Sequence, residues 1–152
     1  MTPWQERAAT VTAAMLGVEP NAGVGLEGGW PQAWHEAVTA GLDAGVVRRI
    51  ARVTGWTPQL VCEVAGLPAR RSDDVGRLDL LESERVARLA WIAGIALVAV
   101  DGNHGGRDWF AAWAQMEFPV LGGRAPIELM GTLPGALWLR DALEAWLRGV
   151  PQ

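Results

Sequence analysis

The sequence has few of the residues from which small active sites are built. It contains one cysteine, two histidines, two serines, and no tyrosine or lysine. One cysteine cannot form an intrachain disulfide, and the histidines at 35 and 104 lie too far from Cys62 in the sequence to make a zinc site of closely spaced ligands. Neither serine lies in the Gly-x-Ser-x-Gly pattern of a nucleophile elbow. We therefore predict a protein that is not an enzyme and that uses no metal or cofactor.

An excess of basic residues is also missing. Thirteen arginines stand against 17 aspartates and glutamates, and the formal net charge is −4. This balance excludes proteins whose main activity is non-specific binding to phosphate backbones, because those carry a clear basic excess. The first residues lack the basic and apolar regions of a signal peptide, and the longest apolar run, 89–100, is about half as long as a membrane span. These absences predict a cytoplasmic protein that does not enter a membrane.

Helix signals recur along the chain, whereas strand signals are missing. In the N-terminal part, an N-cap threonine, a proline and a glutamine that completes a capping box predict a helix over 3–16. The glycine-rich stretch 18–30 predicts a loop, and 31–45 is predicted to be a second helix. Two short helices over 46–54 and 58–65, joined by a glycine-containing turn, suggest a helix-turn-helix.

A long helix over 80–100 is predicted to be the centre of the fold. Asp79 and Glu82 form a capping box at its start, and Asp101-Gly102-Asn103 is expected to end it. The charges of its first turns are spaced to pair with one another on a solvated face; they are Glu82, Glu84, Arg85 and Arg88.

Two further helices are predicted near the C-terminus. Pro126 begins a short one, and the last helix follows Gly135. Along that last helix one stripe combines spacings of three and four; it consists of Trp138, Leu139, Ala142, Leu143 and Trp146. We therefore predict an all-α helical bundle with a helix-turn-helix-like part over residues 1–78 and a second helical domain over 79–152.

Nine tryptophans are more than a core of this size normally needs. Tryptophan is a preferred anchor of protein–protein interfaces, because it combines a large apolar ring with one hydrogen-bond donor. The sequence leaves open which of the nine belong to the core and which to an interface. Their number favours a binding protein over an enzyme.

Several short motifs follow one another in the second half of the chain. They are GRL at 76–78, LESER at 81–85, a tryptophan at 113, LGGRAPIEL at 121–129, and a threonine and a glycine at 132 and 135. In order and spacing this half resembles the toxin-binding domain of Xre/MbcA/ParS-type antitoxins, the partners of RES-domain toxins. The resemblance implies that residues 79–152 form a toxin-binding domain.

The resemblance also implies a function. It points to the antitoxin of a type II toxin–antitoxin system, whose C-terminal region neutralises a RES-type toxin that consumes NAD or transfers ADP-ribose, by covering the NAD cleft of that toxin. The partner would be this toxin, in a hetero-oligomer, or the chain would form a homodimer. The short proline-initiated helix and the terminal helix offer a docking surface, whose expected residues are Leu121, Gly122, Gly123, Arg124, Pro126, Trp138, Arg140, Trp146 and Arg148.

The N-terminal half of such antitoxins is an Xre-like helix-turn-helix, so the alternative function is a DNA-binding regulator of the chain's own operon. Arg70 and Arg71 are the candidate contacts to operator DNA. However, the segment 67–78 is about three residues shorter than the usual recognition-helix region. It also carries Asp73 and Asp74, which phosphates repel. The sequence therefore leaves DNA binding open.

Overall fold

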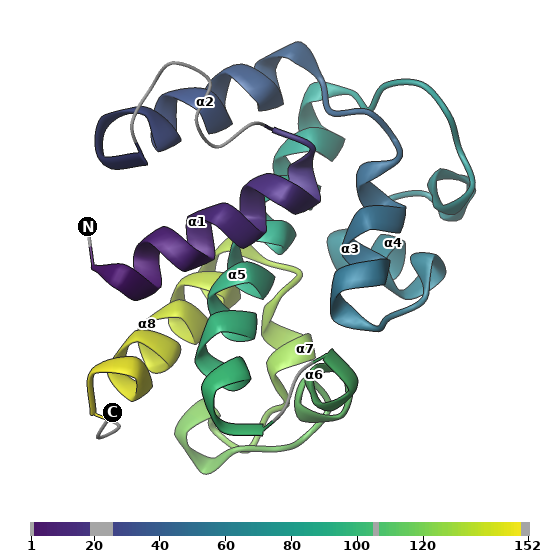
Figure 1. The fold of residues 1–152 in the computed structure, drawn as a ribbon. Coiled ribbons are helices and arrows are strands. Elements are labelled where there is room, and N and C mark those ends of the chain that lie inside the picture. The colour runs from purple at the N-terminus through teal and green to yellow at the C-terminus, as the bar shows by residue number, and fades with distance from the viewer. Residues whose placement is uncertain (1, 19–25, 105–106, 150–152) are drawn as a thin grey trace.

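The computed structural model describes residues 2–18, 26–104 and 107–149, and within these residues it contains helices and loops but no strand. Figure 1 shows the helices gathered around one long central helix. The prediction of an all-α helical bundle is confirmed. In chain order the helices are α1 (Pro3–Leu16), α2 (Leu26–Ala40), α3 (Val46–Thr54), α4 (Pro58–Ala65), the 3₁₀ helix η1 (Ala69–Ser72), α5 (Leu80–His104), α6 (Arg107–Trp113), the 3₁₀ helix η2 (Pro119–Leu121), α7 (Pro126–Leu129) and α8 (Leu133–Gly149).

The central helix is α5, and α1, α2 and α8 pack along it (Figure 1). Its side chains Leu89 and Ile92 are fully buried. It crosses α1 at Gly94, where a Cβ atom would lie only 2.4 Å from Thr12 Oγ1. Because α5 contacts helices from both ends of the chain, buried residues on both sides of position 78 form one hydrophobic cluster.

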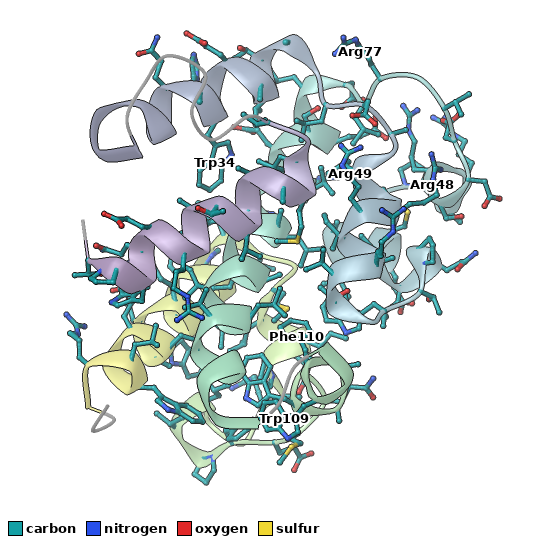
Figure 2. All side chains as sticks on the ribbon, in the orientation of Figure 1. Trp34, Arg48, Arg49, Arg77, Trp109 and Phe110 are labelled. Carbon is teal, nitrogen blue, oxygen red and sulfur yellow. The ribbon has the colours of Figure 1, made fainter. Side chains whose placement is uncertain are left out.

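An aromatic group fills the end of the bundle near α6. Phe110 is fully buried, and its ring centroid lies 5.7 Å from that of Trp56 and 5.6 Å from that of Trp113 (Figure 2). These contacts join the segment after α3 to the C-terminal part of the chain. Trp56 and Trp113 are therefore core residues, whereas Trp138 is 41% exposed.

The helix ends that depend on local signals lie where the sequence predicts them. The capping box of α1 is formed by Thr2 and Gln5, and that of α5 by Asp79 and Glu82, whose backbone N–H and carboxylate groups exchange hydrogen bonds of 2.8 and 3.1 Å. The short helices α3 and α4 end at glycines with left-handed backbone conformations, Gly55 and Gly66.

Three predicted helix boundaries are wrong. First, α2 begins at Leu26 instead of residue 31 and ends at Ala40, because Gly41, with a φ of +85°, ends it four residues before Gly45. The remainder of the predicted loop, 19–25, lies outside the described residues. Second, α5 continues through 101–103 to His104. A glycine inside a helix costs about 1 kcal/mol relative to alanine, and this cost is small compared with the free energy that a long helix gains by packing in the core.

Third, α8 begins at Leu133 rather than after Gly135. The side chain of Thr132 accepts a hydrogen bond of 3.1 Å from the N–H of Gly135 and so caps the helix three residues earlier than expected. Gly135 is inside the first turn, where a Cβ would lie 2.3 Å from the carbonyl oxygen of Leu129. The glycine is needed for the close approach of α7, not for a break before α8.

Candidate functional site

The motif at 121–129 forms a tight loop followed by a short helix. In this glycine loop, which we define as residues 118–124, the N–H of Phe118 donates to the carbonyl of Arg124 at 3.1 Å and the N–H of Gly123 donates to that of Phe118 at 3.0 Å. Gly122 and Gly123 have φ values of +65° and +79°, which only glycine adopts without strain. The loop therefore has a fixed shape that depends on both glycines.

Arg124, at the end of the glycine loop, lies over the indole of Trp138 from α8. The guanidinium carbon is 6.0 Å from the ring centroid, within the range of a cation–π interaction. Gly122 lies beside both residues, because a Cβ built on it would be 3.2 Å from Arg124 Nη1 and 3.5 Å from the Trp138 ring. Arg124 and Trp138 are both exposed. We refer to Gly122, Arg124 and Trp138 as the Arg124–Trp138 surface.

Other residues of the predicted docking surface are buried and pack beneath the glycine loop. Leu121 is 3% exposed and Pro126 is buried. The N–H of Ala125 donates to a carboxylate oxygen of Glu128 at 2.7 Å, and the N–H of Ile127 donates to the carbonyl of Ala114 at 2.9 Å. These contacts fix α7 against the end of α6. Leu121 and Pro126 therefore position the Arg124–Trp138 surface, and their side chains offer little area to a partner.

The predicted tryptophan stripe of α8 faces the glycine loop. Ala142 and Trp146 line a small apolar hollow of about 40 Å³ together with Phe118, Val120 and Leu121. Trp146 is half-buried there. Leu139 and Leu143 of the same stripe are buried, and together with Ala136 they form the core side of α8.

Arg140 lies on the opposite edge of α8 from Trp138, since two residues correspond to about 200° of rotation around a helix. Its guanidinium carbon is 5.9 Å from the centroid of Trp91 on α5, and it pairs with Asp141 at 2.8 Å. Arg148 is exposed in the last turn of the helix. The residues expected to form one surface are thus divided between two edges of α8.

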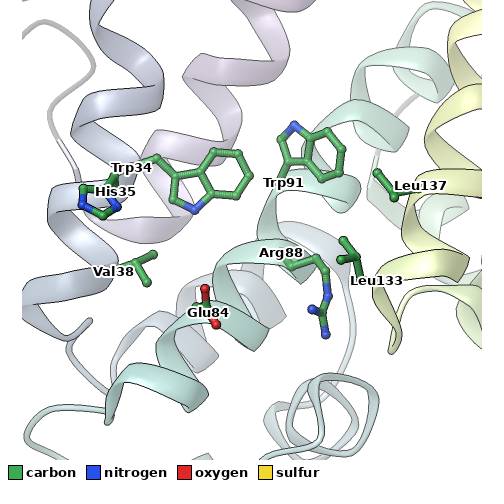
Figure 3. A pocket seen from close by; sticks show the side chains of 8 residues that line it. All are labelled: Trp34, His35, Val38, Glu84, Arg88, Trp91, Leu133 and Leu137. Carbon is green, nitrogen blue, oxygen red and sulfur yellow. The ribbon is translucent and has the colours of Figure 1, made fainter.

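An open groove that no sequence motif indicates lies beside the edge of α8 that carries Arg140. It has a volume of about 740 Å³ and lies between α2 and α8, with α5 as its floor (Figure 3). Leu133 and Leu137 line it and are 53% and 36% exposed. The spacing of four residues between Leu133 and Leu137 places them on one edge of the helix, outside the predicted stripe of α8. This edge was not predicted, because the helix was expected to begin only after Gly135.

The arginines near the predicted DNA-binding region are largely engaged within the fold. Arg71 binds Glu82 at 2.8 Å and Asp74 at 2.6 Å. Arg49 donates to the carbonyls of Met15 and Leu16 at the end of α1, and Arg77 donates to that of Gly41 (Figure 2). Arg70, by contrast, keeps 67% of its side chain exposed, with Asp74 at 3.5 Å. The segment between α4 and α5 contains the four-residue helix η1 and no longer helix.

The prediction that Glu82 lies on a solvated face is wrong. Its side chain is only 9% exposed, and its partner is Arg71. The hydrogen bonds from Arg71 hold the pKa of the Glu82 carboxyl below its ordinary value. Arg85 donates to the carbonyl of Gly66 at 3.2 Å. A non-local partner thus replaces the pairing expected within α5.

Other candidate chemistry is limited in the part of the chain that the structure describes. Cys62 is a buried thiol, 1% exposed, and burial raises its pKa. Among the described residues, no three histidine, cysteine, aspartate or glutamate side chains are grouped so that they could hold a metal ion. None of the described helices is long and apolar enough to cross a membrane.

Comparison with known proteins gives one match and one negative result. No curated protein matches the sequence. Residues 95–149 match the family described as the antitoxin Xre/MbcA/ParS C-terminal toxin-binding domain. The matched segment runs from the second half of α5 through the glycine loop and α7 to the end of α8, and so contains the whole Arg124–Trp138 surface. This region of the chain is therefore similar to the toxin-binding domain of the Xre/MbcA/ParS antitoxins.

Proposed function

We propose that the chain is the antitoxin of a type II toxin–antitoxin system and that it neutralises a RES-type toxin that consumes NAD or transfers ADP-ribose. The observation that carries this proposal is the Arg124–Trp138 surface, an exposed cation–π pair inside the segment that matches a toxin-binding domain. Interface energy concentrates in tryptophan and arginine side chains. The surface therefore has the composition of a protein-binding hot spot.

The shape of the surface also supports inhibition by covering the NAD cleft. The glycine loop is held by its own hydrogen bonds and by α7, so little conformational entropy is lost on binding. NAD contains two aromatic rings, and a cleft that accepts them also has room for an indole. In this proposal Trp138 enters the cleft and Arg124 lies at its rim.

Co-expression with the toxin tests the proposal. We expect a gene for a RES-type protein beside the coding sequence, and we expect the antitoxin to restore growth and cellular NAD in cells that express that toxin. Trp138→Ala should weaken binding of the purified toxin by about thirtyfold, the equivalent of a hot-spot truncation of about 2 kcal/mol. Gln59→Ala, on the exposed side of α4, is the matched control and should bind like the wild type. Unchanged toxicity in the presence of folded wild-type protein would contradict the proposed function.

DNA binding by the N-terminal half is the second candidate function. The observation in its favour is the pair of short helices α3 and α4, joined by a turn at Gly55 as in a helix-turn-helix. Arg70 is an exposed cation within the expected recognition segment. The engagement of Arg71 within the fold weakens this candidate, because it leaves fewer donors for a phosphate backbone.

A further inference from the structure

The groove between α2 and α8 has the size and the lining of a site for a small molecule. Its volume of about 740 Å³ lies within the roughly 300–1,000 Å³ that is typical of ligand pockets. Eight side chains line it, whereas a stable protein–protein interface takes about 20–30 residues from each partner (Figure 3). The dimensions of the groove therefore favour a small molecule over a folded protein.

The walls of the groove are apolar and leave room for a flat ring. Trp34 from α2 and Trp91 from α5 lie with their ring centroids 5.9 Å apart, and both are half-buried. The opposite wall is the edge of α8 that carries Leu133 and Leu137, which are 53% and 36% exposed (Figure 3). Aromatic rings pack favourably against other aromatic rings and bury a large apolar area. A planar, largely apolar body therefore fits between Trp91 and the two leucines.

The floor of the groove contains an arginine that its own chain leaves unpaired. The Nε of Arg88 is buried without a hydrogen-bond partner, and within the described residues Arg88 has no ion pair. Glu84 lies four residues earlier on α5, a spacing at which glutamate and arginine often pair, but it is exposed and makes no such pair. Because buried polar atoms in folded proteins are nearly always hydrogen-bonded, we expect an occupant of the groove to bring an acceptor to Arg88.

The start of α8 adds positive potential at the same place. Leu133 is the first residue of this 17-residue helix and lines the groove together with Arg88 (Figure 3). The N-terminus of a helix carries a partial positive charge, and the first turn of α8 contains no acidic residue to balance it. Two neighbouring N–H groups of a guanidinium match the two oxygens of a carboxylate. A single negative charge suits this end of the groove better than a doubly charged phosphate, which Glu84 would repel more strongly.

We propose that the groove binds a small aromatic carboxylate, with its acid group on Arg88 and its ring between Trp91 and the edge formed by Leu133 and Leu137. None of the residues of the Arg124–Trp138 surface lines the groove, so this site is separate from the proposed toxin contact and does not depend on it. The ligand stabilises the free protein, because a molecule that binds only the folded state shifts the unfolding equilibrium toward that state.

Titration calorimetry of the full chain with indole-3-acetate tests the site. This acid combines a flat two-ring body with one carboxylate, and we expect a Kd on the order of 100 μM for a ligand of its size. Indole-3-acetamide has the same ring and no charge, and it should bind at least about tenfold more weakly because it lacks the charged acceptor. Acetate has no ring and should not bind measurably. Thermal unfolding should show stabilisation by the aromatic acid alone.

Substitutions on α5 assign the binding to the groove. Arg88→Met keeps the length of the side chain and removes its charge, so it should weaken binding of indole-3-acetate by roughly tenfold or more and abolish the preference for the acid over the amide. The free variant should be at least as stable as the wild type, because it no longer buries an unpaired Nε. Glu84→Arg, at an exposed position, should bind the acid roughly threefold more tightly and leave the amide unchanged. Arg52→Met, the same replacement on the exposed side of α3, should bind like the wild type.

Three results would overturn the proposal. They are a Kd for indole-3-acetate weaker than about 1 mM, equal affinity for the acid and the amide, and acid binding that neither Arg88→Met nor Glu84→Arg alters. If the acid does not bind and Arg88→Met weakens binding of the toxin, the groove receives a protein side chain instead of a small molecule. A toxin that binds Arg88→Met like the wild type, together with acid binding that this variant loses, would leave the site independent of the proposed function.

Discussion

Arg71 donates two parallel hydrogen bonds to Glu82, from Nε to Oε2 at 3.0 Å and from Nη2 to Oε1 at 2.8 Å. The same guanidinium reaches Asp74 at 2.6 Å, and Glu82 also accepts from the N–H of Asp79 at 3.1 Å. One arginine thus fastens the segment around η1 to the first turn of α5. Because both side chains are largely shielded from water, each depends on the other for its neutralisation.

The Arg71–Glu82 pair predicts how stability depends on pH. The pKa of Glu82 is lowered in the folded protein from its ordinary value of 4.5, chiefly by the hydrogen bonds from Arg71. A lowered pKa means that the ion pair contributes fully above the ordinary value and that its contribution is lost as the pH falls through the lowered value. Glu82→Gln should therefore unfold at lower urea concentration than the wild type at neutral pH, and the difference should shrink in acid.

Urea unfolding at a series of pH values measures this difference. Glu63→Gln removes an exposed carboxylate from α4 and serves as the control, with little change expected at any pH. If the urea concentration at the midpoint of unfolding differs between wild type and Glu82→Gln by the same amount at neutral and acidic pH, the ion pair does not stabilise the fold.

The crossing of α1 and α5 predicts that Gly94→Ala destabilises the protein. In an exposed helix this change would gain about 1 kcal/mol of helix propensity. Here the new Cβ would lie 2.4 Å from Thr12 Oγ1 and 3.1 Å from the carbonyl oxygen of Ala8. Separating the two helices should cost about 1–3 kcal/mol net, measured as a lower free energy of unfolding. Adding Thr12→Ala removes the nearer atom and should recover part of the loss, and a more stable Gly94→Ala protein would mean that the helices do not cross this closely.

Local signals predicted much of this fold, and non-local contacts account for what was missed. The capping boxes of α1 and α5 depend on residues three apart, so the sequence alone reveals them. The partner of Glu82 lies 11 residues away, and pairing rules within one helix could not find it. Similarly, the sequence marks the motif at 121–129 as part of a docking surface, but the division of α8 into two edges depends on where the glycine loop and α5 lie against it.

DNA binding is expected to be weak or absent for the isolated protein. Arg71 is held by Glu82 and Asp74, and Arg70 alone cannot replace the several phosphate contacts that specific binding requires. Arg70→Ala should change affinity for the promoter of the chain's own operon little, whereas Arg71→Ala should lower stability. Fluorescence anisotropy with the promoter and with a scrambled duplex, at physiological salt, measures both affinities. Tight binding to the promoter and not to the scrambled duplex would show that the N-terminal half binds DNA in a sequence-specific manner.

The last prediction separates the two edges of α8 in toxin neutralisation. Trp138 is 41% exposed and is held by Arg124 rather than by the core. Its truncation should therefore cost clearly less stability than the roughly 3–5 kcal/mol typical of a buried tryptophan. Trp138→Ala and Arg124→Ala should stay folded and yet fail to protect cells from the toxin. Arg140→Ala and Arg148→Ala, on the other edge, should protect like the wild type at matched antitoxin levels.

Single substitutions are the right probes for this comparison. Deleting the chain from residue 147 onward also removes Leu147, which packs against the core, so a loss of protection by that truncation would combine folding with binding. Thermal unfolding of each variant shows whether it is folded, and binding to purified toxin gives the affinity. If Arg140→Ala or Arg148→Ala abolishes protection while Trp138→Ala retains it, the toxin docks on the edge that faces α5, and the exposed cation–π pair has another purpose.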